Sequence, residues 1–79
     1  MKIDGKLIGK ELRSLRNKND YTIDYVCKNV GLNQTTLYKY ERNADTMQLK
    51  ILKRLLDFYK IDEIIFFKVI SAYNHIEGE

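Results

Sequence analysis

The stretch TIDYVCKNVGLNQTTLYKYER, residues 22–42, has the pattern of two short helices separated by a glycine. Its first part carries an apolar stripe at helical spacing, formed by Val26, Cys27 and Val30. Thr22 lies just before this stripe, where a hydroxyl side chain caps the first turn of a helix. Gly31 lies just after it, and glycine adopts the left-handed conformation at a helix end without a steric penalty. The first helix of the pair is therefore predicted over residues 23–30.

The second part of the stretch predicts a helix with one buried face and one polar face. Asn33 is a strong capping residue, so this helix is expected over residues 34–42. Leu37 and Tyr40 lie three positions apart and are expected to point inward. Amide, hydroxyl, phenol and amine groups occupy the outward positions Gln34, Thr35, Tyr38 and Lys39. Because such groups bond to base edges and phosphates, the pair has the layout of a DNA-binding helix-turn-helix.

The rest of the chain shows helical periodicity and no convincing strand. Leu7, Ile8, Leu12 and Leu15 recur at helical spacing, and they predict a helix over about residues 6–18, capped by Asp4. Asn43 is expected to adopt the left-handed conformation at the end of the helix over residues 34–42, and Thr46 is expected to cap a fourth helix. Asp62 is expected to cap a fifth. The sequence thus predicts an all-α fold of five helices.

Length and composition restrict the class of protein. The 79 residues contain no proline, repeat or low-complexity linker, so residues 1–79 are expected to form one domain with a small core. No long apolar run predicts a membrane span or signal peptide, and the single cysteine, Cys27, favours a reducing cytoplasm. Cys27 and His75 alone cannot supply a metal site, and no cofactor or catalytic constellation is recognisable. A soluble, cytoplasmic protein that is not an enzyme is expected.

The charge of the chain is unevenly distributed. The formal net charge is +3, and residues 1–43 carry nine Lys and Arg against five Asp and Glu. Residues 44–79 carry five against six. The positive half is the half that contains the helix-turn-helix pattern, which suits a polyanionic partner such as double-stranded DNA.

In this order and spacing, the motifs resemble the phage repressor and Cro family of helix-turn-helix regulators, also called the xenobiotic-response-element type. The resemblance covers residues 7 to about 66. It rests on the LRSLR segment at 12–16, Thr22, Cys27, Gly31, Asn33, Leu37 and the YERN sequence at 40–43. It implies a five-helix, lambda-repressor-like DNA-binding domain whose second motif helix enters the major groove.

The resemblance also implies which residues bind DNA. The base-reading positions are Gln34, Thr35, Tyr38 and Lys39, and the flanking DNA-binding candidates are Asn33, Thr36, Lys28, Arg42 and Asn43. Ile23 occupies the position where many relatives have a phosphate-binding glutamine, so Tyr25 or Lys28 is expected to replace that contact. Arg16 and Glu41 match positions where the family often has an ion pair between its first helix and the end of the recognition helix.

The C-terminal helix, expected over residues 62–76, carries more apolar side chains than so small a domain can bury. Ile64 and Ile65 are expected to complete the core. The expected dimer interface is an apolar stripe of Phe66, Val69, Ile70, Tyr73 and Ile76, suited to a second copy of the same helix. The alternative is an ordinary core helix with a frayed tail after Asn74.

These features predict a sequence-specific transcription regulator, most often a repressor in this family, that binds a palindromic operator as a homodimer. The alternative is a protein-interaction module, such as an antitoxin or a helix-turn-helix adaptor, that binds a partner protein through its C-terminal helix. Salt-dependent binding to a palindromic duplex would distinguish the two.

Overall fold

The computed structural model describes the backbone of residues 4–77 and the side chains of residues 4–73. It contains five helices: α1 (Gly5–Lys18), α2 (Ile23–Val30), α3 (Gln34–Arg42), α4 (Leu49–Tyr59) and α5 (Glu63–Glu77). No strand occurs among the residues that it describes, so the all-α, five-helix prediction is confirmed. None of the helices in this part of the chain is long and apolar enough to cross a membrane.

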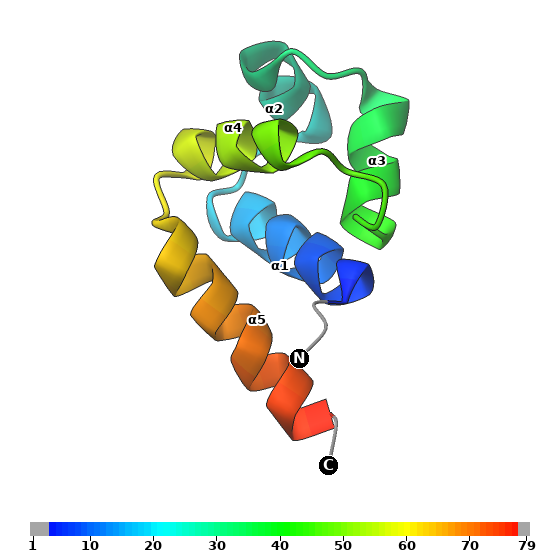
Figure 1. Cartoon of the computed structure of the whole chain (residues 1–79). Helices are drawn as coiled ribbons and strands as arrows, with labels where there is room; N and C mark the ends of the chain where they lie inside the picture. Colours follow the sequence, from blue (N-terminus) through cyan, green and yellow to red (C-terminus); the bar gives the residue numbers. More distant parts are fainter. Residues whose placement is uncertain (1–3, 78–79) are drawn as a thin grey trace.

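The helices surround one apolar core. Helix α1 contacts α3 and α5, while α2 contacts α3 and α4, and Figure 1 shows α5 projecting away from the other helices toward its C-terminal end. The largest fully buried side chains come from every helix: Leu12, Val26, Leu37, Leu55, Leu56, Phe66 and Ile70. Each such side chain stabilises the fold by roughly 1.5–3 kcal/mol relative to an exposed position. The core therefore fixes the position of all five helices.

The caps expected for the first three helices are present. Asp4 accepts a hydrogen bond from the backbone N–H of Lys6 at 2.8 Å, and Thr22 accepts one from Tyr25 at 3.1 Å. Asn33 accepts one from the backbone N–H of Thr36 at 2.8 Å. Each bond satisfies a donor that has no partner within its own helix. The capping residues therefore set where these helices begin.

Gly31 confirms the expected turn between α2 and α3. Its φ of 75° is left-handed, and its N–H donates to the carbonyl of Cys27 at 2.9 Å. The N–H of Leu32 donates to the same carbonyl at 3.1 Å, which closes the end of α2. A side chain at this φ would be strained, so glycine allows the chain to turn directly from α2 into α3.

The connection between α3 and α4 differs from the prediction. Asn43 is extended, with a φ of −161°, rather than left-handed. The N–H of Ala44 donates to the Gly5 carbonyl at 2.9 Å, and the N–H of Gly5 donates to Asp45 Oδ1 at 3.1 Å. These bonds join the loop to the start of α1, and an extended Asn43 is what allows the chain to reach it.

The start of α4 is also later than predicted. The helix begins at Leu49, and its N-cap is Gln48, whose side chain makes no capping bond, rather than Thr46. The N–H of Met47 donates to the Ala44 carbonyl at 3.0 Å, so Thr46 lies within a turn. Because hydrogen bonds hold this loop against α1, the helix begins only at Leu49, although threonine is in general a better capping residue than glutamine.

Helix α3 approaches α1 closely at Gly9. A Cβ at this position would lie 2.5 Å from the Tyr40 carbonyl oxygen and 2.6 Å from that of Glu41. Real Cβ atoms do not approach backbone oxygens so closely, so only glycine allows this distance between the helix axes. The contact brings the C-terminal half of α3 against α1.

The orientation of α5 corrects the sequence prediction. Phe66 and Ile70 are 0% and 1% exposed, so they belong to the core of the chain and are not available to a partner. Ile64 and Ile65, expected in the core, are 68% and 56% exposed. Because Ile64 lies about 200° around the helix from Phe66, the two cannot face the core together. Val69 is half-buried and Tyr73 is exposed, while the side chains of His75 and Ile76 lie outside the described residues.

Candidate DNA-binding surface

The exposed face of α3 carries the four residues expected to read bases. Gln34, Thr35, Tyr38 and Lys39 are all exposed, and their spacing of one, three and one positions places them on one side of the helix. Leu37, on the opposite side, is fully buried. The structure therefore brings these four side chains together on one exposed surface of the molecule.

A largely buried ion pair holds the end of this helix against α1. Arg16 donates from Nε to Glu41 Oε2 at 2.8 Å and from Nη2 to Glu41 Oε1 at 3.0 Å. Its Nη1 also donates to the Tyr21 carbonyl at 3.1 Å. The Arg16 and Glu41 side chains are only 13% and 4% exposed, and the bond to Glu41 raises the pKa of the arginine. The pair implied by the family resemblance is confirmed, and its bidentate geometry fixes the orientation of α3.

The start of α3 is bonded to α2 through Asp24. Gln34 donates from Nε2 to Asp24 Oδ1 at 3.2 Å, and Lys28 Nζ lies 3.0 Å from Asp24 Oδ2. The bond from Lys28, followed by that from Gln34, holds the pKa of this exposed carboxyl below its ordinary value. Two residues predicted to bind DNA thus share one carboxylate that the sequence pattern had not assigned to the surface.

A hollow of about 240 Å³ lies beside Tyr38, lined by Arg13, Arg16, Tyr38, Glu41 and Arg42. Arg16 is paired with Glu41, whereas Arg13 and Arg42 are exposed and form no ion pair within the part of the chain that the structure describes. Arg13 lies on α1, outside the helix-turn-helix, and the motif therefore did not indicate it. Arg13 lies three residues before Arg16, so the two share one face of α1. This spacing is the sequence signal that could have indicated Arg13 as part of the surface.

The remaining candidates have local structural contacts. Asn33 caps α3, Thr36 is half-buried, and Asn43 accepts a hydrogen bond from the backbone N–H of Asp45 at 2.8 Å. Ile23 is buried in the core and has no side-chain donor, so it cannot form a hydrogen bond to a phosphate. Tyr25 and Lys28 remain exposed on the same helix. Among the described residues, no three His, Cys, Asp or Glu side chains are grouped as a metal site.

Two connected helices, a left-handed glycine between them and a polar exposed face on the second define a helix-turn-helix protein. Residues 12–66 match the model of the helix-turn-helix family HTH_3. The chain therefore belongs to the Cro/C1-type helix-turn-helix family and is a DNA-binding transcription regulator. No curated protein sequence matches it.

The fold is similar to that of the restriction-modification controller protein C.Esp1396I. The triclinic wild-type crystal structure has a TM-score of 0.81 and 15% identity, with 95% of this chain and 96% of that chain covered. An alanine variant of the same protein has a TM-score of 0.80 and 15% identity, with 94% of this chain and 95% of that chain covered. A trigonal crystal form of another alanine variant has a TM-score of 0.79 and 16% identity, with 85% of this chain and 89% of that chain covered. At such low identity the similarity shows the fold.

Proposed function

We propose that this regulator is a repressor that binds a palindromic operator as a homodimer, with α3 in the major groove. The observation that carries the proposal is the row of exposed polar side chains on α3, whose orientation is fixed by the buried pair of Arg16 and Glu41. A helix held rigidly presents its donors and acceptors in one register along the bases. Repression then follows from occupation of a promoter and requires no chemical step.

Three side chains of this row supply the proposed base contacts. The Gln34 amide is suited to the N6 and N7 edge of adenine, and Lys39 to guanine or a phosphate. The Tyr38 ring suits a thymine methyl group and its hydroxyl a phosphate. Arg13 and Arg42, in the hollow next to Tyr38, are proposed to bind the flanking phosphates of the same half-site. Thr35 lies within the same row.

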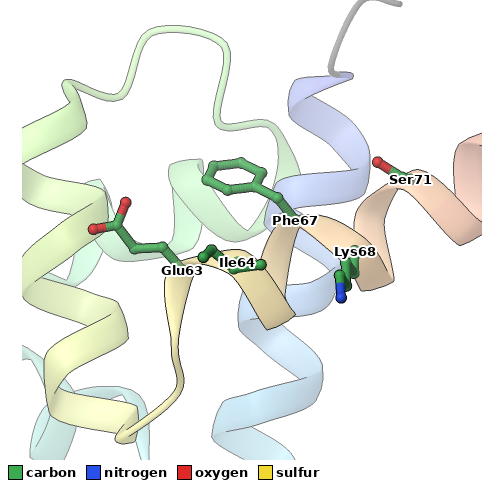
Figure 2. Close-up of a pocket in the computed structure, with 5 residues that line it drawn as sticks. All are labelled: Glu63, Ile64, Phe67, Lys68 and Ser71. Carbon is green, nitrogen blue, oxygen red and sulfur yellow. The ribbon is translucent and has the colours of Figure 1, made fainter.

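The proposed dimer surface is a pair of neighbouring apolar hollows, here called the Phe67 groove. One hollow, of about 450 Å³, is lined by Glu63, Ile64, Phe67, Lys68 and Ser71, all from one face of α5 (Figure 2). The other, of about 270 Å³, is lined by Gly5, Ile8, Ala44, Asp45, Met47, Leu49, Leu52 and Phe67. Leu49 and Ile64 are the two most exposed large apolar side chains of the described residues.

The position of the Phe67 groove supports its assignment to a second copy. One of its hollows is lined in part by Ala44 and Asp45, in the loop that follows α3. A twofold partner bound there lies beside the recognition helix, so both recognition helices belong to one DNA-binding surface. Half-sites about 10 base pairs apart are then contacted by two helices about 34 Å apart.

Selection from a random duplex library tests this proposal. We expect the recovered sites to be inverted repeats, and binding to weaken steeply with salt as phosphate contacts displace counterions. A reporter gene whose promoter overlaps the recovered site should be expressed less when the regulator is present. Recovery of single half-sites only would contradict the dimeric form, and increased reporter expression would contradict repression.

A Gln34→Ala variant separates specific from general binding. Loss of the amide should cost about 1–3 kcal/mol on the selected site and leave binding to random duplex almost unchanged. An equal loss on both duplexes would show that Gln34 does not specify a base. If the wild-type chain shows no salt-dependent affinity for any duplex, the protein-interaction module becomes the better description.

A further inference from the structure

The carboxylate of Asp24 connects Gln34, to which the proposed function assigns a base contact, with Lys28, which the sequence predicts to bind DNA. Its Oδ1 accepts from Gln34 Nε2 at 3.2 Å, and its Oδ2 is paired with Lys28 Nζ at 3.0 Å. Asp24 itself is exposed in the first turn of α2. Both oxygens of one side chain are therefore occupied at the junction between α2 and α3.

The chemistry of these partners gives the Gln34 amide a direction. A glutamine amide carries an acceptor oxygen and a donor nitrogen that exchange places when the group flips. A carboxylate only accepts hydrogen bonds, so an ionised Asp24 requires that Nε2 face it. The Oε1 atom and the second N–H of Gln34 are then left for other partners.

We propose that Asp24 is a specificity-determining residue, which orients the Gln34 amide so that it selects adenine and rejects guanine. This inference rests on the proposed function. Adenine presents an N6–H donor beside the N7 acceptor, and a fixed amide can match both with Oε1 and its second N–H. Guanine presents two acceptors, O6 and N7. A freely flipping amide could turn Nε2 toward them, whereas an amide held by Asp24 opposes O6 with its own oxygen.

Lys28 supports this role of Asp24. It lies four residues further along α2, so it holds the carboxylate in place and offsets its negative charge near the phosphates. The Lys28 and Asp24 side chains are 75% and 54% exposed, so the pair adds little to the stability of the free protein. When DNA excludes water from this junction, the same bonds become stronger. Asp24 is therefore a positioning residue whose effect appears in the bound state.

An Asp24→Asn variant tests the inference through two measurements that change in opposite directions. Asparagine keeps the shape but both donates and accepts, so it no longer dictates which way Gln34 points. The base pair contacted by Gln34 is the one at which replacement of A·T by G·C weakens binding of the wild-type chain but has no effect on the Gln34→Ala variant. At that pair, we expect Asp24→Asn to reduce the preference for A·T at least fivefold. Affinity for random duplex should rise, because a negative charge is removed.

Two controls separate positioning from charge. Asp57→Asn removes an equal charge from an exposed position on α4, so it should leave the preference unchanged. In a Gln34→Ala background, Asp24→Asn should not alter discrimination at that pair, because the group that it orients is absent. Thermal unfolding checks that each variant folds. A structural role alone would weaken binding to both duplexes and leave their ratio constant.

The outcomes distinguish this inference from the proposed function. If the wild-type chain prefers A·T at the Gln34 position and Asp24→Asn retains that preference in full, the inference is wrong and the proposed function stands. If the wild-type chain does not discriminate among duplexes, the proposed function fails, and the inference fails with it. A preference that falls only in Asp24→Asn, while Asp57→Asn keeps it, supports the inference.

Discussion

Helices α3 and α5 are held in the fold by different forces. The C-terminal half of α3 is fixed by a charged pair, Arg16 with Glu41, and by close contact with α1 at Gly9. Helix α5 is held by apolar packing of Phe66 and Ile70, and its ionic contact to α4, Lys53 with Glu63 at 3.8 Å, is exposed. An ion pair depends on direction and on both partners, whereas apolar packing depends on volume. The helix proposed to bind DNA thus has the more directional attachment.

The largest expected effect comes from removing one partner of the buried pair. Glu41→Ala leaves the Arg16 guanidinium largely buried without its carboxylate, and it should lower the free energy of unfolding by about 3–5 kcal/mol. Replacing both residues with apolar side chains should cost less than the single change. Urea denaturation of both single variants and the double variant measures the coupling energy.

The exposed pair of Lys28 and Asp24 is the matched control for this prediction. Because both side chains are more than half exposed, Lys28→Ala should change the stability by less than about 1 kcal/mol. Purely additive effects of changes at Arg16 and Glu41 would show that the pair does not fix α3. Helix α3 would then be held, like α5, mainly by apolar packing.

A pair of neighbouring aromatic residues tests the packing of α5. Phe66 is fully buried and Phe67 half-buried, so Phe66→Ala should destabilise the fold by about 3–5 kcal/mol and Phe67→Ala by less than half of that. The same denaturation experiment measures both. Equal losses would mean that the orientation of α5 about its axis is different from the one described above.

The difference between the two helices also explains which parts of the fold the sequence could predict. In α3 the buried positions are Leu37 and Glu41, one turn apart, so the polar face was identified from spacing alone. In α5 apolar residues occur at 64–67, 69 and 70, which surround the helix axis, so spacing could not identify the buried side. The buried side of α5 is determined by its packing against the other helices. Asn43 and Thr46 were misassigned for a similar reason, since bonds to distant Gly5 shape that loop.

For the candidate surface, the sequence indicated α3 but missed contributions from its neighbours. Gln34, Thr35, Tyr38 and Lys39 follow from the motif, because their positions within one helix are fixed by its period. Arg13 and Asp24 lie on α1 and α2, and their proximity to α3 depends on how closely the helices approach and at what angle. No local pattern contains that information. Whether these residues bind DNA remains a prediction.

Adjacent isoleucines on α5 locate the proposed dimer surface. Ile64 lines the Phe67 groove and Ile65 does not, although both are more than half exposed. Ile64→Asp should place a charge in the interface and give a monomer with unchanged helical content. Operator affinity should fall at least tenfold, because the second recognition helix loses its effective concentration. Sedimentation reports the mass, and gel shifts report the affinity.

Ile65→Asp is the control for this variant and should remain dimeric. The reverse result, with Ile65→Asp monomeric and Ile64→Asp dimeric, would move the interface to the face that carries Val69 and Tyr73, two residues of the sequence-predicted stripe. A wild-type chain that sediments as a monomer at micromolar concentration would exclude a stable dimer in the absence of DNA.

The smallest expected effect concerns Glu11, an acidic side chain buried on α1. Burial raises the pKa of its carboxyl above the ordinary value, although the nearby Lys18 acts in the opposite direction. The folded chain therefore binds this proton more tightly than the unfolded chain does. Its contribution to stability should rise as the pH falls through the interval between the ordinary and the raised pKa, and it should be lost as the pH rises again.

Glu11→Gln keeps the shape of the side chain and removes the cost of burying a charge. It should raise the thermal midpoint at pH 7, and this gain should shrink once the pH falls below the ordinary pKa of a glutamate, where the wild-type residue is protonated in both states. Asp57→Asn, at an exposed position on α4, provides the comparison for removal of a negative charge. A gain for Glu11→Gln that is the same at pH 7 and pH 4 would mean that the carboxyl does not titrate differently in the two states. The stabilisation would then come from packing, and α1 would resemble α5 in depending on volume rather than on charge.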